Sequence, residues 1–128
     1  MRLLLDTCTF LWVVGGAKEL SARTREAFAD PGNEVLLSAA SAWEVAVKHR
    51  LGRLPLPESP DTFVPSQRTA HGIGRLDVDE ESALHLAKLP DLHRDPFDRM
   101  LVAQALVGGL TLVTPDDAIR QYPVRTLW

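Results

Sequence analysis

The stretch Leu3-Leu4-Leu5-Asp6-Thr7 decides the fold class, because a wholly apolar run is followed at once by an acid. A strand that is apolar on both sides, instead of alternating, is typical of a parallel sheet covered on each face. The runs Glu34–Ser38 and Leu110–Val113 have the same character, and a helical segment follows each of them. We therefore expect an α/β fold: a three-layer α/β/α sandwich with a central parallel sheet.

Strand and helix patterns alternate along the rest of the chain. The first strand is expected at Arg2–Leu5. Besides it and the two runs just given, short strands are expected at Arg75–Val78 and Val124–Leu127. Helices are expected at Thr7–Val14, Ser21–Ala29, Ser41–Arg50, Asp61–Ala70 (despite Pro65), Asp79–Lys88, Pro96–Val107 and Pro115–Arg120. In parallel sheets of this kind the ligand site lies beyond the carboxyl ends of the strands.

Composition excludes several classes of protein. The 128 residues, 45% of them hydrophobic, predict one domain over residues 1–128 with its own core. The net charge of −3 argues against a nucleic-acid coat held by bulk positive charge. One cysteine, Cys8, excludes a disulfide framework. An acid at position 6 and a broken apolar stretch at Met100–Pro115 exclude a secretory signal and a membrane span, so we expect a cytoplasmic protein.

Acidic side chains recur just after the predicted strand ends. Asp6 closes the first strand, and Glu44 follows the strand Glu34–Ser38. Asp95 and Asp98 begin the helix near Pro96, and Asp116 follows the last long strand. Because helix starts lie along one edge of a parallel sheet, we expect these carboxylates to meet in one crevice.

Each acid also has a purely structural explanation. The run Ser41-Ala42-Trp43-Glu44 has the spacing of a capping box, in which Glu44 reaches back to the Ser41 N–H. Asp95 has the position of an N-cap, and Asp98 that of a first-turn acid. Asp6 and Asp116 can cap helices in the same way. For each acid taken alone, capping is the favoured interpretation.

Taken together, the acids favour a metal site. Carboxylates that converge on one crevice repel one another unless a cation shares it. Oxygen ligands without His or Cys suit Mg²⁺ or Mn²⁺ better than zinc. Such ions activate water and stabilise phosphoryl displacement, so the residues predict a Mg²⁺-dependent phosphodiesterase or phosphatase.

Four segments together resemble a PIN-domain ribonuclease and, more closely, the VapC-type toxins of bacterial toxin–antitoxin pairs. They are Leu3–Thr7, Ser38–Glu44, His93–Leu101 and Leu112–Asp116. The resemblance extends to the end of the chain at Val124–Trp128, and the segment His93–Leu101 is its most specific part. One departure is Cys8, where many relatives carry His or Asn; we expect a buried thiol there.

The resemblance implies a fold, an activity and partners. The fold implied is an α/β/α sandwich, and the activity is metal-dependent cleavage of RNA with Mg²⁺ or Mn²⁺ as cofactor. The implied partners are an antitoxin of the VapB type that covers the crevice, the RNA substrate and a second copy of the chain. The implied catalytic residues are Asp6, Glu44, Asp95 and Asp116, with Asp6, Asp95, Asp98 and Asp116 on the metal and Thr114 orienting the last acid.

Substrate contacts are assigned to residues around these acids: Thr114, Lys48, Arg50, Arg94 and Arg99. Lys48 and Arg50 are also explained as cations at a helix end, and the arginines as partners of the neighbouring acids. The apolar run Phe10–Val14 favours contact with a partner.

Two other functions stay open. A receiver-like module or small phosphatase also places acids at strand ends, although the sequence holds no Lys beyond Lys88 and no G-x-x-x-x-G-K-[ST] loop. The third hypothesis is an RNA-binding module without catalysis.

Overall fold

A parallel sheet forms the middle of the molecule. The computed structural model describes residues 1–128. Its strands lie in the order β3-β2-β1-β4-β5, and every pair is parallel. They span β1 (Arg2–Leu5), β2 (Glu34–Ser38), β3 (Gly74–Leu76), β4 (Thr111–Val113) and β5 (Thr126–Leu127).

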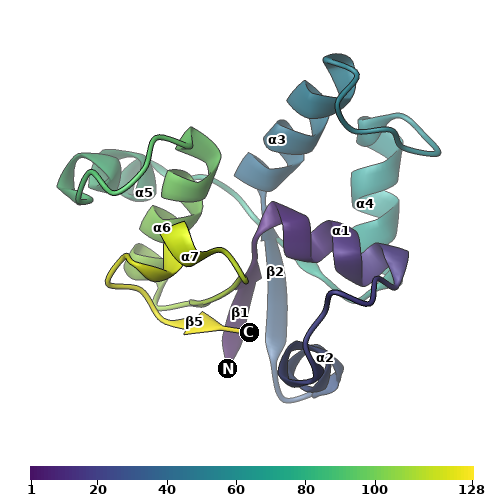
Figure 1. The fold of residues 1–128 in the computed structure, drawn as a ribbon, viewed down its shortest axis with the longest axis horizontal. Coiled ribbons are helices and arrows are strands. Elements are labelled where there is room, and N and C mark those ends of the chain that lie inside the picture. The colour runs from purple at the N-terminus through teal and green to yellow at the C-terminus, as the bar shows by residue number, and fades with distance from the viewer.

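Helices connect the strands and cover both faces of the sheet (Figure 1). They are α1 (Thr7–Gly15), α2 (Ala22–Ala29), α3 (Ala39–Arg50), α4 (Pro60–Ala70), α5 (Glu80–His85), a 3₁₀ turn (Leu86–Lys88), α6 (Pro96–Gly108) and α7 (Asp117–Arg120). The predicted α/β/α sandwich is confirmed. No helix has both the length and the apolar character needed to cross a membrane.

Alternating leucines build a separate core on each side of the sheet. Leu4 and Leu36 face a cluster that includes Leu101 of α6 and Ile119 of α7. Leu3, Leu5 and Leu37 face the other way, against a cluster that includes Phe10 of α1 and Phe63 of α4. Burial on both faces is the reason that these strands read as continuous apolar runs.

The helix α3 begins earlier than the capping-box pattern predicts. Ser38, the last residue of β2, is its N-cap, and the Ser38 hydroxyl accepts a hydrogen bond from the Ala40 N–H at 3.0 Å. The strand therefore runs directly into the helix, and the predicted capping box at Ser41–Glu44 is wrong. The consequence is that Glu44 lies in the second turn, free to make long-range contacts.

The edge strands are shorter than predicted. The segment expected at Arg75–Val78 is the strand Gly74–Leu76, and the one expected at Val124–Leu127 is Thr126–Leu127. Strands at an edge have a partner on only one side, so apolar pattern alone overestimates their length. A Cβ at Gly74 would lie 2.9 Å from Leu36 Cδ2, so any side chain there would require the Leu36 side chain to shift.

The other helix ends differ by one or two residues. The predicted helix Pro115–Arg120 starts at Asp117 because Asp116 is its N-cap. The predicted helix Asp79–Lys88 divides into α5 and the 3₁₀ turn, with Asp79 as N-cap. The helix expected around Pro65 is confirmed as α4.

Candidate active site

Strand register brings the acidic segments to one edge of the sheet. Leu5 of β1 is paired with Leu37 of β2 on one side and with Val113 of β4 on the other. The three strands therefore end side by side, and Asp6 follows directly, its N–H donating to the Val113 carbonyl at 3.2 Å. The starts of α1, α3 and α7 lie together at this edge (Figure 1).

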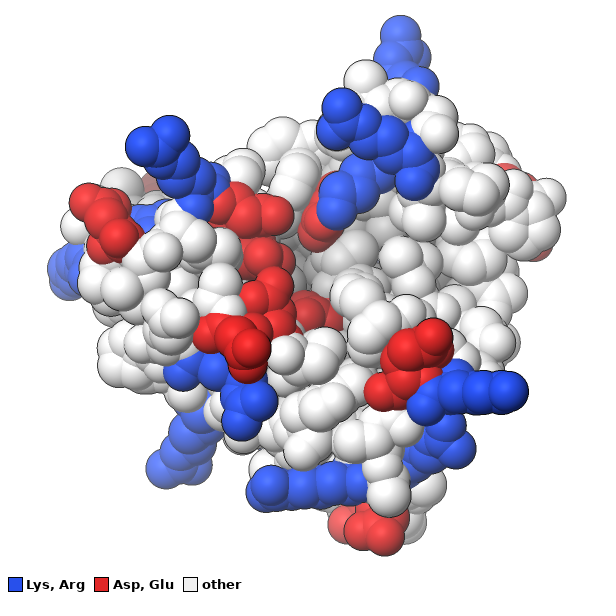
Figure 2. Space-filling model, in the orientation of Figure 1, with Lys and Arg blue, Asp and Glu red and all other residues white.

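Five carboxylates line one cavity of about 410 Å³ at this edge, hereafter the acidic cavity. Figure 2 shows acidic side chains along a hollow in the middle of this face, with basic side chains on its rim. The acids are Asp6, Glu44, Asp95, Asp98 and Asp116, and the remaining lining consists of Thr7, Cys8, Leu11, Trp12, Lys48, Arg53 and Leu54. The structure thus brings together every acid that the sequence assigned to catalysis or metal binding.

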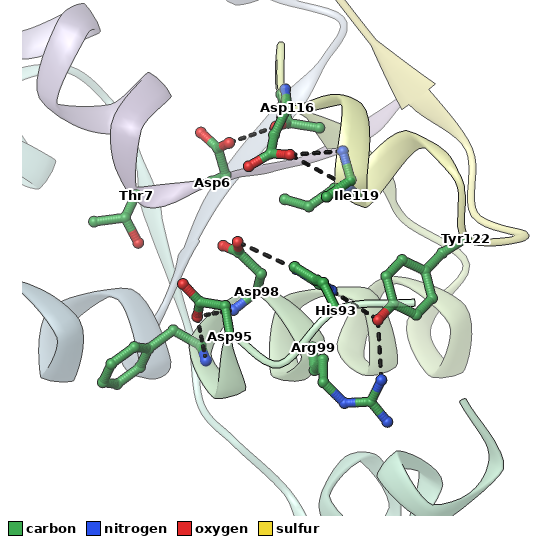
Figure 3. A network of polar contacts seen from close by, with 12 residues as sticks. Asp6, Thr7, His93, Asp95, Asp98, Arg99, Asp116, Ile119 and Tyr122 are labelled. Atoms are coloured by element: carbon green, nitrogen blue, oxygen red, sulfur yellow. Dashed lines mark hydrogen bonds and ion pairs between the residues drawn. The ribbon is translucent and has the colours of Figure 1, made fainter. Parts of the chain in front are cut away.

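Three of these acids cap a helix and also line the acidic cavity. Oδ1 of Asp6 accepts from the Thr9 N–H at 2.7 Å, and Oδ1 of Asp95 accepts from the N–H groups of Phe97 and Asp98. Oδ1 of Asp116 caps α7 in the same way. A carboxylate has two oxygens, so one can hold a helix start while the other serves a second purpose. Figure 3 shows Asp6 and Asp116 close to Asp95 and Asp98, the last two of which both lie at the start of α6.

Thr114 connects two of the acids from behind. It is fully buried; its hydroxyl donates to Asp6 Oδ2 at 2.5 Å and accepts from the Asp116 N–H at 3.0 Å. A residue with no exposed surface has nothing to offer an RNA chain directly. This placement favours a positioning role over the predicted substrate contact.

Glu44 is buried and held on both oxygens. The Thr7 hydroxyl donates to Oε1 at 2.6 Å, and Ser41 Oγ lies 3.0 Å from the Thr7 hydroxyl. Oε2 forms an ion pair with the ammonium of Lys48, one turn further along α3. The role of Thr7 was missed at the level of sequence, where its only signal is its place next to Asp6.

Burial, together with the crowding of carboxylates, raises the affinity of the cavity for protons. Burial, followed by the charges of Asp95 and Glu44, raises the pKa of Asp98 to about 7. Burial also raises the pKa of Asp6, against hydrogen bonds from Thr114 and Thr9 that lower it. The hydrogen bond to Glu44 raises the pKa of Lys48. A site that retains protons and an ammonium in this way also attracts other cations.

The residues assigned to substrate contact are placed differently. Lys48 lines the acidic cavity, together with Arg53, whereas Arg50 and Arg94 are exposed outside it. The Arg99 guanidinium donates to the carbonyls of Pro90 and Leu86 and to the Tyr122 hydroxyl. Substrate contact by any of them stays a prediction, and the geometry favours Lys48 over the arginines of α6 and the preceding loop.

The donor set of the cavity fits a hard divalent cation. As the side chains stand, no three acidic, His or Cys groups of the chain form a ready-made ion site. The cavity nevertheless offers carboxylate oxygens, the ligands that Mg²⁺ and Mn²⁺ prefer. Cys8 is exposed at the edge of the cavity and not buried as predicted. Partial desolvation of its thiol, together with the Asp6 charge, still raises its pKa to about 11. The thiol is therefore protonated near neutral pH, which leaves the carboxylate oxygens as the anionic donors that line the cavity.

Comparison with known proteins is consistent with this geometry. The PIN domain family model matches residues 3–124. Ribonuclease VapC16 of Mycobacterium tuberculosis (strain ATCC 25618 / H37Rv) is 45% identical over 62 residues, which is 48% of this chain and 44% of that protein. The matched region thus spans less than half the length of that relative.

Solved structures share the fold across the whole chain. A chain of VapBC2 from Rickettsia felis, bound to a DNA fragment from its promoter, superimposes with a TM-score of 0.74 at 12% identity, covering 99% of this chain and 98% of that one. A chain of DNA-bound VapBC from Salmonella typhimurium gives 0.69 at 20% identity, covering 99% and 97%. A chain of a toxin–antitoxin complex from Klebsiella pneumoniae gives 0.63 at 17% identity, covering 98% and 96%.

Proposed function

Because this chain belongs to the PIN domain family, we propose that it is a Mg²⁺- or Mn²⁺-dependent endoribonuclease that acts as the toxin of a toxin–antitoxin pair. The observation that carries the proposal is the acidic cavity, in which five carboxylates from four separate segments of the chain line one hollow. Residues 1–128 act in this proposal as one nuclease domain in the cytoplasm.

The aspartates would hold the divalent ion, and Glu44 would act as the general base for the attacking water. Asp6, Asp95, Asp98 and Asp116, which all line the cavity, would supply the oxygen ligands. A bound ion supplies two effects, a more acidic water and neutralisation of the charge on the phosphodiester. Glu44 is held by Thr7 at a fixed position in the cavity, where it can accept a proton from the attacking water. Hydrolysis then adds one water across a P–O bond of the RNA backbone.

The basic residues beside the cavity suit the RNA backbone. Lys48 and Arg53 both line the acidic cavity. Their charges offset the acids for an incoming polyanion and offer direct contacts to phosphate oxygens. The overall charge of −3 would otherwise repel RNA, so the local pair has a specific use.

The apolar rim of the cavity suits a protein partner. Leu11 and Trp12 of α1 line the acidic cavity and are only partly buried. The structural relatives include chains from toxin–antitoxin complexes. We propose that an antitoxin covers this rim and closes the cavity to RNA. A second copy of the chain is also proposed as a partner, for which Trp43, 62% exposed and edge-on to Phe97, offers an apolar surface.

The test is cleavage of a cellular RNA pool with Mg²⁺ or with chelator, mapped by sequencing of the new RNA ends. We expect cuts at defined positions that disappear with chelator and in Asp95→Asn. Cleavage that continues in chelator would refute the metal dependence. Turnover of a phosphomonoester without RNA cleavage would refute the assignment as a nuclease. A small neighbouring gene with a DNA-binding start would support the toxin role.

A further inference from the structure

His93 lies between a buried hydroxyl and one acid of the cavity (Figure 3). Its Nδ1 is 2.8 Å from the hydroxyl oxygen of Tyr122, a residue that is 3% exposed. Its Nε2 is 3.5 Å from Asp98 Oδ2. That nitrogen is buried and has no hydrogen-bond partner in the structure. Burying an imidazole nitrogen without a hydrogen-bond partner costs folding free energy, so its presence next to a functional acid calls for an explanation.

The bond from Arg99 and the burial of Tyr122 together indicate where the protons of the Tyr122 hydroxyl and the His93 imidazole lie. A guanidinium only donates, so the Tyr122 oxygen must accept the bond from Arg99 Nη1 at 2.9 Å. The buried Tyr122 hydroxyl has His93 Nδ1 as its only other polar neighbour, so donation to Nδ1 is the one arrangement that gives its proton an acceptor. The opposite arrangement, with Nδ1–H donating to the same oxygen, would leave the hydroxyl proton and a bare Nε2 lone pair both buried without partners. A neutral imidazole that accepts at Nδ1 carries its proton on Nε2. The N–H of His93 therefore faces Asp98.

Asp98 is the aspartate of the cavity that lacks a capping bond. Asp6, Asp95 and Asp116 each accept backbone N–H bonds that fix their carboxylates. The carboxylate of Asp98 accepts no hydrogen bond in the structure, and the nearest cationic or imidazole nitrogen is His93 Nε2. The donor without an acceptor and the acid without a donor thus face each other.

We propose that Tyr122 and His93 form a positioning pair for Asp98, in which the Tyr122 hydroxyl fixes the imidazole so that its Nε2–H orients the Asp98 carboxylate. The pair rests on the proposed role of Asp98 as a metal ligand. Arg99 belongs to this arrangement, because its bonds to the Leu86 and Pro90 carbonyls and to Tyr122 hold the hydroxyl in place. Side chains that orient a metal ligand typically change metal affinity 10- to 100-fold when they are removed.

Nitrogen NMR of the imidazoles tests the proton positions directly. In the metal-free full chain at about pH 8, where ordinary imidazoles are neutral, we expect the Nε2–H form for His93. His49 and His71 are internal references, since their Nδ1 atoms lie 2.9 and 2.8 Å from the carbonyl oxygens of Leu54 and Gln67. A carbonyl only accepts, so both references should show the Nδ1–H form. A His93 spectrum like those of the references would overturn the proposal.

The variant Tyr122→Phe tests the consequence. It keeps the ring beside His93, whose centroid is 5.4 Å away, and removes only the hydroxyl. We expect a mixture of proton positions on His93, unchanged references, and Mn²⁺ affinity reduced about 10-fold by calorimetry. Cleavage should recover at saturating Mn²⁺. His93→Gln, which can still donate an N–H, should bind Mn²⁺ more tightly than His93→Leu.

Ser66→Ala is the matched control, because it removes a hydroxyl bonded to the Phe63 carbonyl in α4, away from the cavity. It should leave both readouts unchanged. Tyr122→Phe with wild-type Mn²⁺ affinity would refute the positioning role. Failure of the wild-type chain to bind Mn²⁺ would instead refute the proposed function and the positioning role with it, and the NMR spectrum would still show whether the proton positions are correct.

Discussion

Asp98→Asn is expected to make the metal-free protein more stable than the wild type above neutral pH. The Asp98 side chain is 18% exposed, and burial with the neighbouring charges raises its pKa from 3.8 to about 7. Ionisation of Asp98 therefore costs free energy in the folded chain that it does not cost in the unfolded one. Asn has nearly the same shape and never ionises.

The size of the effect follows from the shift. A folded pKa above the unfolded one means that the folded state binds the proton more tightly, so stability falls as pH rises from about 4 through 7. A difference of about three units would correspond to roughly 4 kcal/mol at full ionisation. Solvent access to the partly exposed group reduces this to about 2–3 kcal/mol. Wild type and variant should have similar stabilities at about pH 4 and diverge above it.

Urea unfolding in chelator across this pH range measures the difference. Asp117→Asn is the control, because its side chain is 93% exposed at the start of α7. It should follow the wild-type profile at every pH. Excess Mg²⁺ should flatten the wild-type profile, since a bound cation replaces the proton. Parallel profiles for the wild type and Asp98→Asn in chelator would refute the electrostatic account of the cavity.

Three further outcomes are expected. Asp6→Asn should abolish RNA cleavage yet change the free energy of unfolding by about 1 kcal/mol or less, since Asn still caps α1; retained cleavage would contradict the assignment. Lys48→Met removes the ammonium paired with Glu44, so calorimetry should show tighter Mn²⁺ binding, and weaker binding would argue that Lys48 supports the ion. Cys8 should react with iodoacetamide about 100-fold more slowly than an unperturbed thiol near neutral pH, because its pKa is about 11, and faster once Mg²⁺ is bound; the reaction rate of a free cysteine would contradict this.

The two interpretations of the acids, helix capping and metal binding, are both compatible with the structure. Asp6, Asp95 and Asp116 are N-caps and also line the acidic cavity. Glu44 is the exception, because its helix starts at Ser38 and leaves no free N–H for it to cap. Local pattern could not separate these cases, since a capping box and a mid-helix acid differ only by where the helix begins.

Local signals in the sequence were enough for the sheet, the order of helices and strands, and the edge at which the acids gather. Each of those features depends on residues close in the chain: apolar runs, caps and glycines. The contacts Thr7–Glu44, Thr114–Asp6 and Tyr122–His93 were decided by the tertiary structure alone. They join residues that are 29 to 108 positions apart. The raised pKa of Asp98 likewise depends on burial in the folded chain and on charges that folding brings near it, that of Glu44 among them, besides the charge of its neighbour Asp95. Hydrogen bonding and charge interaction act over a few ångströms of space, which only the packing of α1, α3, α6 and α7 around the sheet determines.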